Sequence, residues 1–365
     1  MPEVAMKRLV FLFVAWFGFA AAMPAGEIKL TAKVIPISGG EDGFFSHAHA
    51  MILAGERLFL LENLKHRVLL FRLRGGRAEF LKAIGRRGQG PGDLNLPFEI
   101  SAAEGVLSVR DQYGVSRFTL DGEFLDRFRI PFHSLAMNLE AGRYYFLSAI
   151  PGETHLIHAL SENGEKEGSM LRKTLAIKAS GNKDVSWEML ERYFYEGRLF
   201  AAPARLYYLN TMLARLTELD RSGRLVRSAF LDPELGEAAR KNVRKNNEML
   251  RRGLEVEQQA GGGLAIPWRV ICRDACLFKG RLYLLDPPGA GEAGMGGGRP
   301  GPGIRRIDLR SLRLDAEYRL DAAAGAPSIQ SFLVGEEAGK LFFLACQEVD
   351  GDSGIVRYAI GPAAK

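Results

Sequence analysis

Residues 142–147 read GRYYFL, a glycine turn followed at once by a short run of aromatic and aliphatic side chains. The same combination of a turn and a mostly apolar run of four residues occurs six times along the chain. The six runs lie at residues 58–61, 106–109, 144–147, 206–209, 282–285 and 341–344. Each run is followed by a polar or turn-forming segment and a second alternating strand, as at residues 68–73 and 304–309. This order of elements is typical of β-hairpins.

The sixfold repeat predicts a closed ring of small sheets. A third strand often follows, as at residues 120–125, so that each unit has three or four antiparallel strands. Self-similarity at about 40 to 50 residues with four strands per unit is the pattern of a β-propeller blade. One such sheet cannot bury both of its faces alone, whereas packing it between two neighbours around an axis buries both. We therefore expect an all-β chain that folds as a six-bladed β-propeller.

The six blades do not use the whole chain, because six blades of about 45 residues need only about 270. We expect a single propeller over residues 27–362 with short helical insertions. The interruptions are predicted as helical insertions near 183–197 and 232–260 and a Gly/Pro-rich loop at 287–303. Residues 28–37 have a good strand pattern, and the last repeat ends at residues 355–360. We expect the N-terminal strand to complete the last blade and close the ring.

The N-terminus has the features of an export signal in their usual order. A basic pair precedes an apolar run at residues 9–19, which is too short to cross a bilayer comfortably, and small alanines follow it. We expect a signal peptide over residues 1–25, cleaved after Ala22 or Ala25; the alternative is a retained membrane anchor. No other stretch approaches the roughly 20 apolar residues of a spanning helix. The expected location is periplasmic or secreted, with no transmembrane segment after cleavage.

Charge and cysteine content exclude some partners and leave one question open. The net charge of +6 comes from 49 basic and 43 acidic residues that are interspersed along the chain, so no nucleic-acid partner is expected. On one strand Cys272 and Cys276 would lie about 13 Å apart, too far for a disulfide. A pairing of either with Cys346 and a role as small buried apolar residues are both compatible with the sequence.

The segment between the first two repeats resembles a known family. Residues 84–100 read IGRRGQGPGDLNLPFEI, which is similar to the blade junction of NHL-like six-bladed propellers. Residues 106–118 read VLSVRDQYGVSRF and resemble the hairpin that follows in that family, with Gly114 where asparagine is usual. The resemblance covers the first two blades and implies a binding or scaffolding module for a protein, peptide or glycan. A phosphate loop is the weaker interpretation of the glycines, because no Lys-Ser/Thr ending and no helix follow.

Candidate ligand-binding residues are expected at the mouth of the axial channel. His47 and His49 are two residues apart, so on a strand their side chains would lie on one side, as in some metal sites; a solvated or hydrogen-bonded role is the alternative. The other candidates are Arg86, Arg87, Arg110 and Asp111. A cluster of these side chains would favour an anionic ligand. Asp111 also has a structural interpretation, since an aspartate at such a position commonly sets a turn.

No catalytic centre is recognised in the sequence, because no G-x-S-x-G elbow or other local nucleophile signature is present. The alternative to a binding module is a metal-dependent enzyme of the lactonase or lyase type that six-bladed propellers sometimes host. Its Ca or Zn ion would lie at the ring axis. The candidate ligands are Glu62, Asn63, Asn138, Asn210 and Asp286. These side chains would have to converge on the axis for this alternative, and would point away from it as turn caps otherwise.

Overall fold

The computed structural model describes most of the strand-forming part of the chain. The described residues are 27–39, 41–132, 134–148, 153–173, 194–231, 235, 237–252, 257–258, 264–265, 270–286, 303–320, 329–349 and 352–360. The predicted signal peptide, residues 183–193 of the first predicted insertion and nearly all of the predicted Gly/Pro-rich loop lie outside them. No helix among the described residues is long and apolar enough to cross a membrane.

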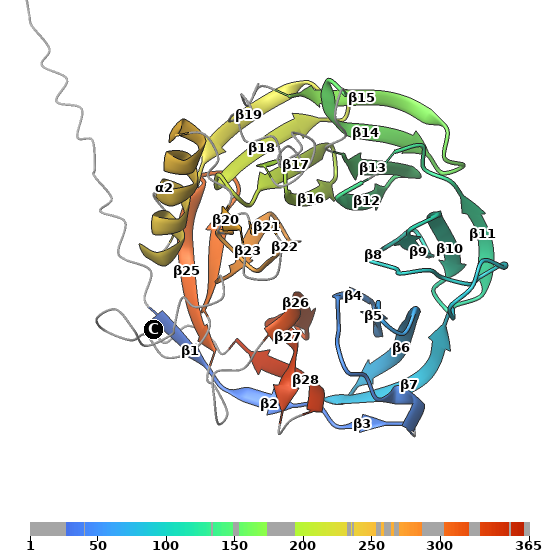
Figure 1. Cartoon of the computed structure of the whole chain (residues 1–365). Helices are drawn as coiled ribbons and strands as arrows, with labels where there is room; N and C mark the ends of the chain where they lie inside the picture. The colour runs from blue at the N-terminus through green and yellow to red at the C-terminus, as the bar shows by residue number, and fades with distance from the viewer. Residues whose placement is uncertain are drawn as a thin grey trace, which may run out of the picture.

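The chain is a six-bladed β-propeller, as the repeat predicts (Figure 1). Blade 1 consists of β4 (Ala50–Ala54), β5 (Arg57–Glu62), β6 (Arg67–Arg74) and β7 (Arg77–Ile84). Blade 2 consists of β8 (Glu99–Ala103), β9 (Val106–Asp111), β10 (Gly114–Thr119) and β11 (Phe124–Phe128). Blade 3 consists of β12 (Ala136–Glu140), β13 (Arg143–Leu147), β14 (His155–Ser161) and β15 (Lys166–Arg172).

The second half of the ring repeats this order. Blade 4 consists of β16 (Gly197–Ala202), β17 (Arg205–Asn210), β18 (Arg215–Asp220) and β19 (Leu225–Phe230). Blade 5 consists of β22 (Asp274–Phe278), β23 (Arg281–Leu285), β24 (Gly303–Asp308) and β25 (Arg313–Leu320). Blade 6 consists of β26 (Ile329–Glu337), β27 (Lys340–Val349), β28 (Asp352–Ala359) and, from the N-terminus, β2 (Ala32–Val34). In every blade the strand named first lies innermost, next to the axis (Figure 1). In blade 6 the N-terminal strand β2 is the outermost.

The N-terminal segment closes the ring differently from the single strand expected over residues 28–37. Only β2 completes the last blade, by antiparallel pairing with β28. Before it, β1 (Glu27–Leu30) pairs in parallel with β25 of blade 5, and after it β3 (Ile37–Ser38) pairs in parallel with β7 of blade 1. The segment follows the outer edges of three successive blades, so its hydrogen bonds must change partner at each boundary. The expectation of one uninterrupted strand was wrong for this reason.

The turns between first and second strands explain why glycine precedes five of the six repeated runs. In blades 2 and 3 the two turn residues are Glu104-Gly105 and Ala141-Gly142, and all four have positive φ angles. Blades 5 and 6 repeat this at Lys279-Gly280 and Ala338-Gly339. Two positive φ angles define the type I′ turn, whose twist matches that of a two-stranded ribbon. Glycine takes such an angle at little steric cost, which makes the second turn position a marker of the hairpin.

The hydrophobic core is divided among the interfaces between blades. Each of the six interfaces contains its own cluster of buried apolar side chains, for example Phe59 and Leu107 between blades 1 and 2. A blade therefore buries both faces only with both neighbours present. Helix α2 (Glu237–Arg252) lies outside the ring and buries Ala239 and Val243 in the cluster between blades 4 and 5 (Figure 1).

Three small elements and the cysteines complete the description. The minor elements are the 3-10 turn η1 (Glu41–Gly43) and the two-stranded ladder of β20 (Glu257–Gln258) and β21 (Leu264–Ala265). All three cysteines are free. Burial raises the pKa of the Cys272 thiol to about 12, and the Cys346 thiol lies 3.0 Å from the Met51 sulfur in the core. Of the two interpretations that the sequence left open, the structure supports small buried apolar residues.

Candidate functional site

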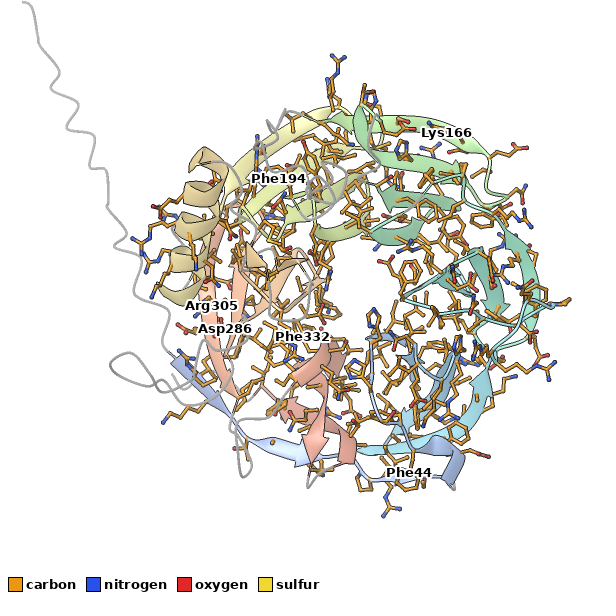
Figure 2. All side chains as sticks on the ribbon, in the orientation of Figure 1. Phe44, Lys166, Phe194, Asp286, Arg305 and Phe332 are labelled. Carbon is orange, nitrogen blue, oxygen red and sulfur yellow. The ribbon has the colours of Figure 1, made fainter. Side chains whose placement is uncertain are left out.

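The two ends of the ring differ in the segments they carry. We call the end at which the innermost strands begin the loop face, and the end at which they turn into the second strands the hairpin face. The junction at residues 85–98 and the turns between second and third strands lie at the loop face, because the strands of each blade alternate in direction. With the described side chains drawn, an opening remains at the centre of the ring (Figure 2).

Polar side chains near the loop-face ends of the innermost strands bridge all six interfaces between blades. Gln330 accepts a hydrogen bond from the Ala48 amide at 2.7 Å, which joins blade 6 to the segment entering blade 1. Asn138 donates to the Leu199 carbonyl at 3.4 Å, between blades 3 and 4. The remaining links are His49 to the Phe98 backbone, the Leu139 amide to Ser101 Oγ at 3.3 Å, Arg198 Nε to Asp274 Oδ1 at 3.6 Å, and the Phe332 amide to Asp274 Oδ2 at 3.2 Å.

Four ionisable side chains at or next to these links interact electrostatically with one another. His49, Glu99, Arg198 and Asp274, which we call the channel cluster, come from blades 1, 2, 4 and 5. Arg198 interacts electrostatically with Asp274 and Glu99, and His49 interacts with both Arg198 and Asp274. Blades 2 and 4 are not neighbours, so the electrostatic interaction between Glu99 and Arg198 reaches past blade 3. The exposed fractions of the Arg198, Glu99 and Asp274 side chains are 40%, 22% and 20%, which leaves all three accessible.

The surroundings of the channel cluster shift its protonation equilibria. Burial raises the pKa of Glu99 above its usual value, although the nearby Arg110 and Arg198 charges oppose the shift. Burial, together with the nearby His47 and Arg198, lowers the pKa of His49. His49 is therefore neutral at pH 7, and its ring can both donate and accept hydrogen bonds.

The other predicted ligand-binding residues have different roles, and Arg110 contacts the channel cluster through Glu99. Arg110 is 1% exposed, its Nε lies 3.3 Å from Glu99 Oε2, and its guanidinium lies 3.6 Å from the centre of the Phe98 ring. Arg110 therefore positions the Glu99 carboxylate from its buried side. Arg86 extends from the junction into solvent and pairs with Asp93 at 3.0 Å.

Arg87 and Asp111 are also outside the channel cluster. The exposed Arg87 is bridged to Leu94 within the junction. Asp111 is buried at the end of β9, where its carboxylate accepts hydrogen bonds from the amides of Asn95, Tyr113 and Gly114 and pairs with a nearby arginine. The structural interpretation of Asp111 as the residue that sets a turn describes these contacts.

The five candidate metal ligands are distributed over four blades. Glu62, Asn210 and Asp286 occupy the same position as Asp111, at the end of the second strand. Glu62 accepts from the Ser46 amide at 3.0 Å and from Arg67 at 2.8 Å.

Two more of the candidates bond within their own blades. Asn210 accepts from the Met212 and Leu213 amides at 3.0 and 2.8 Å, and Asp286 pairs with Arg305 inside blade 5 (Figure 2). Asn63 lies in the turn after β5, and Asn138 bridges two blades as described above. Among the described residues, no group of three or more His, Cys, Asp or Glu side chains is placed to hold a metal ion. The structure does not bring the five candidates together.

The sequence analysis missed Glu99, Arg198 and Asp274. Each lies opposite the fifth residue of the repeated strand: Glu99 opposite Arg110, Arg198 opposite Leu209 and Asp274 opposite Leu285. The sequence did contain a signal for these three residues. The segment just before each repeated run is the innermost strand, and it pairs with that run as a hairpin. Charged residues at that place are unusual in a strand that must pack between two neighbours.

The fold is shared with solved structures. No protein-family model matches the chain, and no curated protein matches it in sequence. A Bacteroides fragilis protein described as exported has a TM-score of 0.56 and 10% identity over 92% of this chain and 98% of that one. A DUF4221 family member from Bacteroides vulgatus has a TM-score of 0.50 and 10% identity over 92% and 97%. At this identity the likeness shows the six-bladed fold alone, and the NHL-like resemblance stays a prediction.

Proposed function

We propose that this chain is an extracytoplasmic binding propeller that holds a peptide, a glycan or a segment of a partner protein at the loop-face mouth of its axial channel. One observation carries the proposal: ionisable side chains from four blades meet at the channel mouth and stay partly exposed there. Charged groups in a narrow, protein-walled opening act on a ligand more strongly than the same groups on an open surface. The export signal predicted from the sequence supports the location.

The chemistry of the channel cluster defines what the ligand must offer. Arg198 presents a planar guanidinium that is suited to a carboxylate or another anionic group. Its own carboxylate partner, Asp274, lies 3.6 Å away and also accepts the Phe332 amide, so Arg198 can take a second acceptor. Glu99 and Asp274 accept hydrogen bonds from donors next to that anionic group. The expected ligand is therefore acidic, with neighbouring hydroxyl or amide donors, and Arg198 is its main contact in place of Arg110.

The test uses arrays of acidic oligosaccharides and of short acidic peptides. At least one array member should bind the wild-type chain, and Arg198→Gln should weaken it about tenfold or more, since hydrogen bonds to charged groups contribute about 1.5–3 kcal/mol. The matched control is Arg224→Gln, which removes an exposed arginine on the hairpin face and should leave affinity unchanged.

Two results would overturn the binding proposal. The first is that no acidic array member binds, or that Arg198→Gln binds as the wild type does. The second is that the purified protein carries one Ca or Zn ion per chain that is needed for turnover of a lactone or a related substrate. That second result would establish the metal-dependent alternative.

A further inference from the structure

The hairpin face is held together at five interfaces by charged contacts. Between blades 1 and 2, Arg57 pairs with Asp121 at 2.6 Å, and between blades 3 and 4, Glu140 pairs with Arg221 at 2.7 Å. In both pairs, a residue beside the first turn of one blade meets the second turn of the next. The other three contacts are Arg117 to Glu162 at 3.9 Å, Arg227 to the Arg310 carbonyl at 2.9 Å, and Lys279 to Glu336.

The sixth interface, between blades 6 and 1, departs from this pattern. The second turn of blade 1 presents Arg74 and Arg77 to it, and blade 6 presents Glu336 and Glu337. Both glutamates are engaged elsewhere, because Glu336 pairs with Lys279 and Glu337 pairs with Arg357 at 2.6 Å. Within the described part of the chain, neither Arg74 nor Arg77 takes part in an ion pair. Two exposed arginines therefore stand where the equivalent interfaces have a pair.

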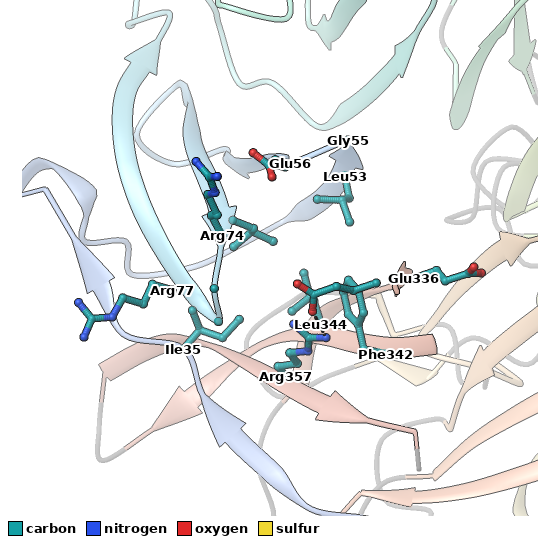
Figure 3. Close-up of a pocket in the computed structure, with 14 residues that line it drawn as sticks. Ile35, Leu53, Gly55, Glu56, Arg74, Arg77, Glu336, Phe342, Leu344 and Arg357 are labelled. Atoms are coloured by element: carbon teal, nitrogen blue, oxygen red, sulfur yellow. Dashed lines mark ion pairs between the residues drawn. The ribbon is translucent and has the colours of Figure 1, made fainter. Parts of the chain in front are cut away.

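A cavity of about 170 Å³ opens at this interface (Figure 3). Its floor is apolar and is built from blade 1, blade 6 and the closing segment. The floor residues are Ile35, Leu53, Leu73, Phe342 and Leu344. An apolar cavity of about 150 Å³ accommodates a benzene ring, so this one has room for an apolar group of about six carbons.

The rim of the cavity is positively charged once its internal pairs are set aside. Arg357 and Glu337 neutralise each other, and Glu336 is paired with Lys279. Arg74, Arg77 and Glu56 remain on the rim, and the Lys33 ammonium lies next to Gly76 in the same turn. Three cations thus face one carboxylate, an excess of two positive charges beside an apolar floor.

We propose that this cavity is a second binding site, distinct from the channel mouth, for a carboxylate that carries an apolar group of about six carbons. The carboxylate pairs with an arginine of this rim, Arg74 or Arg77, and supplies the negative charge that Asp121 supplies between blades 1 and 2. The apolar group covers the floor formed by Leu53, Phe342 and their neighbours. The same chemistry is offered by a free acid and by the C-terminus of a peptide that ends in phenylalanine or leucine.

Isothermal titration calorimetry with phenylpropanoate tests the site on the full chain. The acid should bind, and its neutral amide, which has the same shape, should bind at least about tenfold more weakly, because charge-assisted hydrogen bonds to arginine are lost. The double variant Arg74→Gln/Arg77→Gln should lose affinity for the acid by a similar factor. Arg224→Gln is again the matched control and should bind as the wild type does.

A second pair of probes distinguishes the two sources of the ligand. A tetrapeptide that ends in Phe-COO⁻ and its C-terminal amide are titrated in the same way. Acid peptide binding at least tenfold tighter than phenylpropanoate identifies a peptide terminus as the ligand, and equal or weaker binding identifies a free acid; both results support the site. The site is refuted if neither acid binds at millimolar concentration, if acid and amide bind equally, or if Arg198→Gln in the channel abolishes the binding of phenylpropanoate.

Discussion

The substitution Asp111→Ala should lower the free energy of unfolding by about 3–5 kcal/mol, the usual cost of removing one partner from a buried ion pair. Asp111 is 1% exposed, and both of its oxygens contact Arg127 Nη2, at 2.5 and 2.6 Å. Alanine leaves that guanidinium and the amides of Asn95, Tyr113 and Gly114 without their acceptor. In a chain of this size the loss corresponds to about 4–7 °C in melting temperature.

Urea unfolding followed by circular dichroism measures this loss, with Asp121→Ala as the matched control. Asp121 also pairs with an arginine, but its side chain is 71% exposed, and removing such a surface pair costs about 1 kcal/mol or less. Asp111→Asn keeps one acceptor oxygen and should fall between the two. A loss below about 1 kcal/mol for Asp111→Ala would show that the carboxylate does not hold the turn, and the interpretation of the equivalent residues in other blades would fail with it.

Three further predictions concern the closing segment, a close approach and pH. Deleting residues 27–38 should cost at least about 3 kcal/mol, because buried side chains and strand pairing on three blades are lost; an unchanged melting temperature would disprove closure. Gly114→Ala should cost about 1–3 kcal/mol, since its Cβ would lie 2.1 Å from the Phe128 carbonyl oxygen, whereas Gly168→Ala, with open space around it, should be neutral in the same urea titration. Burial lowers the pKa of His158 below 6.5, so the unfolded chain takes up the proton first and the free energy of unfolding falls as the pH drops below 6.5. His158→Gln should flatten this fall between pH 7 and 5.5. An equal fall in both proteins would argue against this role of His158.

The sequence predicted the number of blades because the second strand of each blade carries a local signal. A run such as residues 282–285 is buried on both sides, so it must be apolar, and the turn before it must accept positive φ. Both requirements are met within a few residues of the chain. The turn-setting interpretation of Asp111 rested on equally local chemistry, and its contacts to Tyr113 and Gly114 are local.

Three of the four members of the channel cluster were missed because the cluster depends on the closed ring. Glu99 and Arg198 are far apart in sequence and lie in blades that do not touch, so only the ring geometry brings their charges together. Arg110 was predicted to contact a ligand because it is a charged residue in a repeated strand. In the structure Arg110 is buried, and its partner Glu99 is the more exposed of the two. The threefold division of the closing segment also follows from the ring, since β1 and β3 pair with blades at either side of the last one.

The closing segment also determines when the ring can close during synthesis. Lys33 is opposite Arg357 in the pairing of β2 with β28, so a residue near the start of the described chain finds its partner only after β28 has been made. Until then the ring cannot close, because blade 6 is incomplete and buries its faces only against blades 5 and 1. The native ring therefore closes only after β28 has been made.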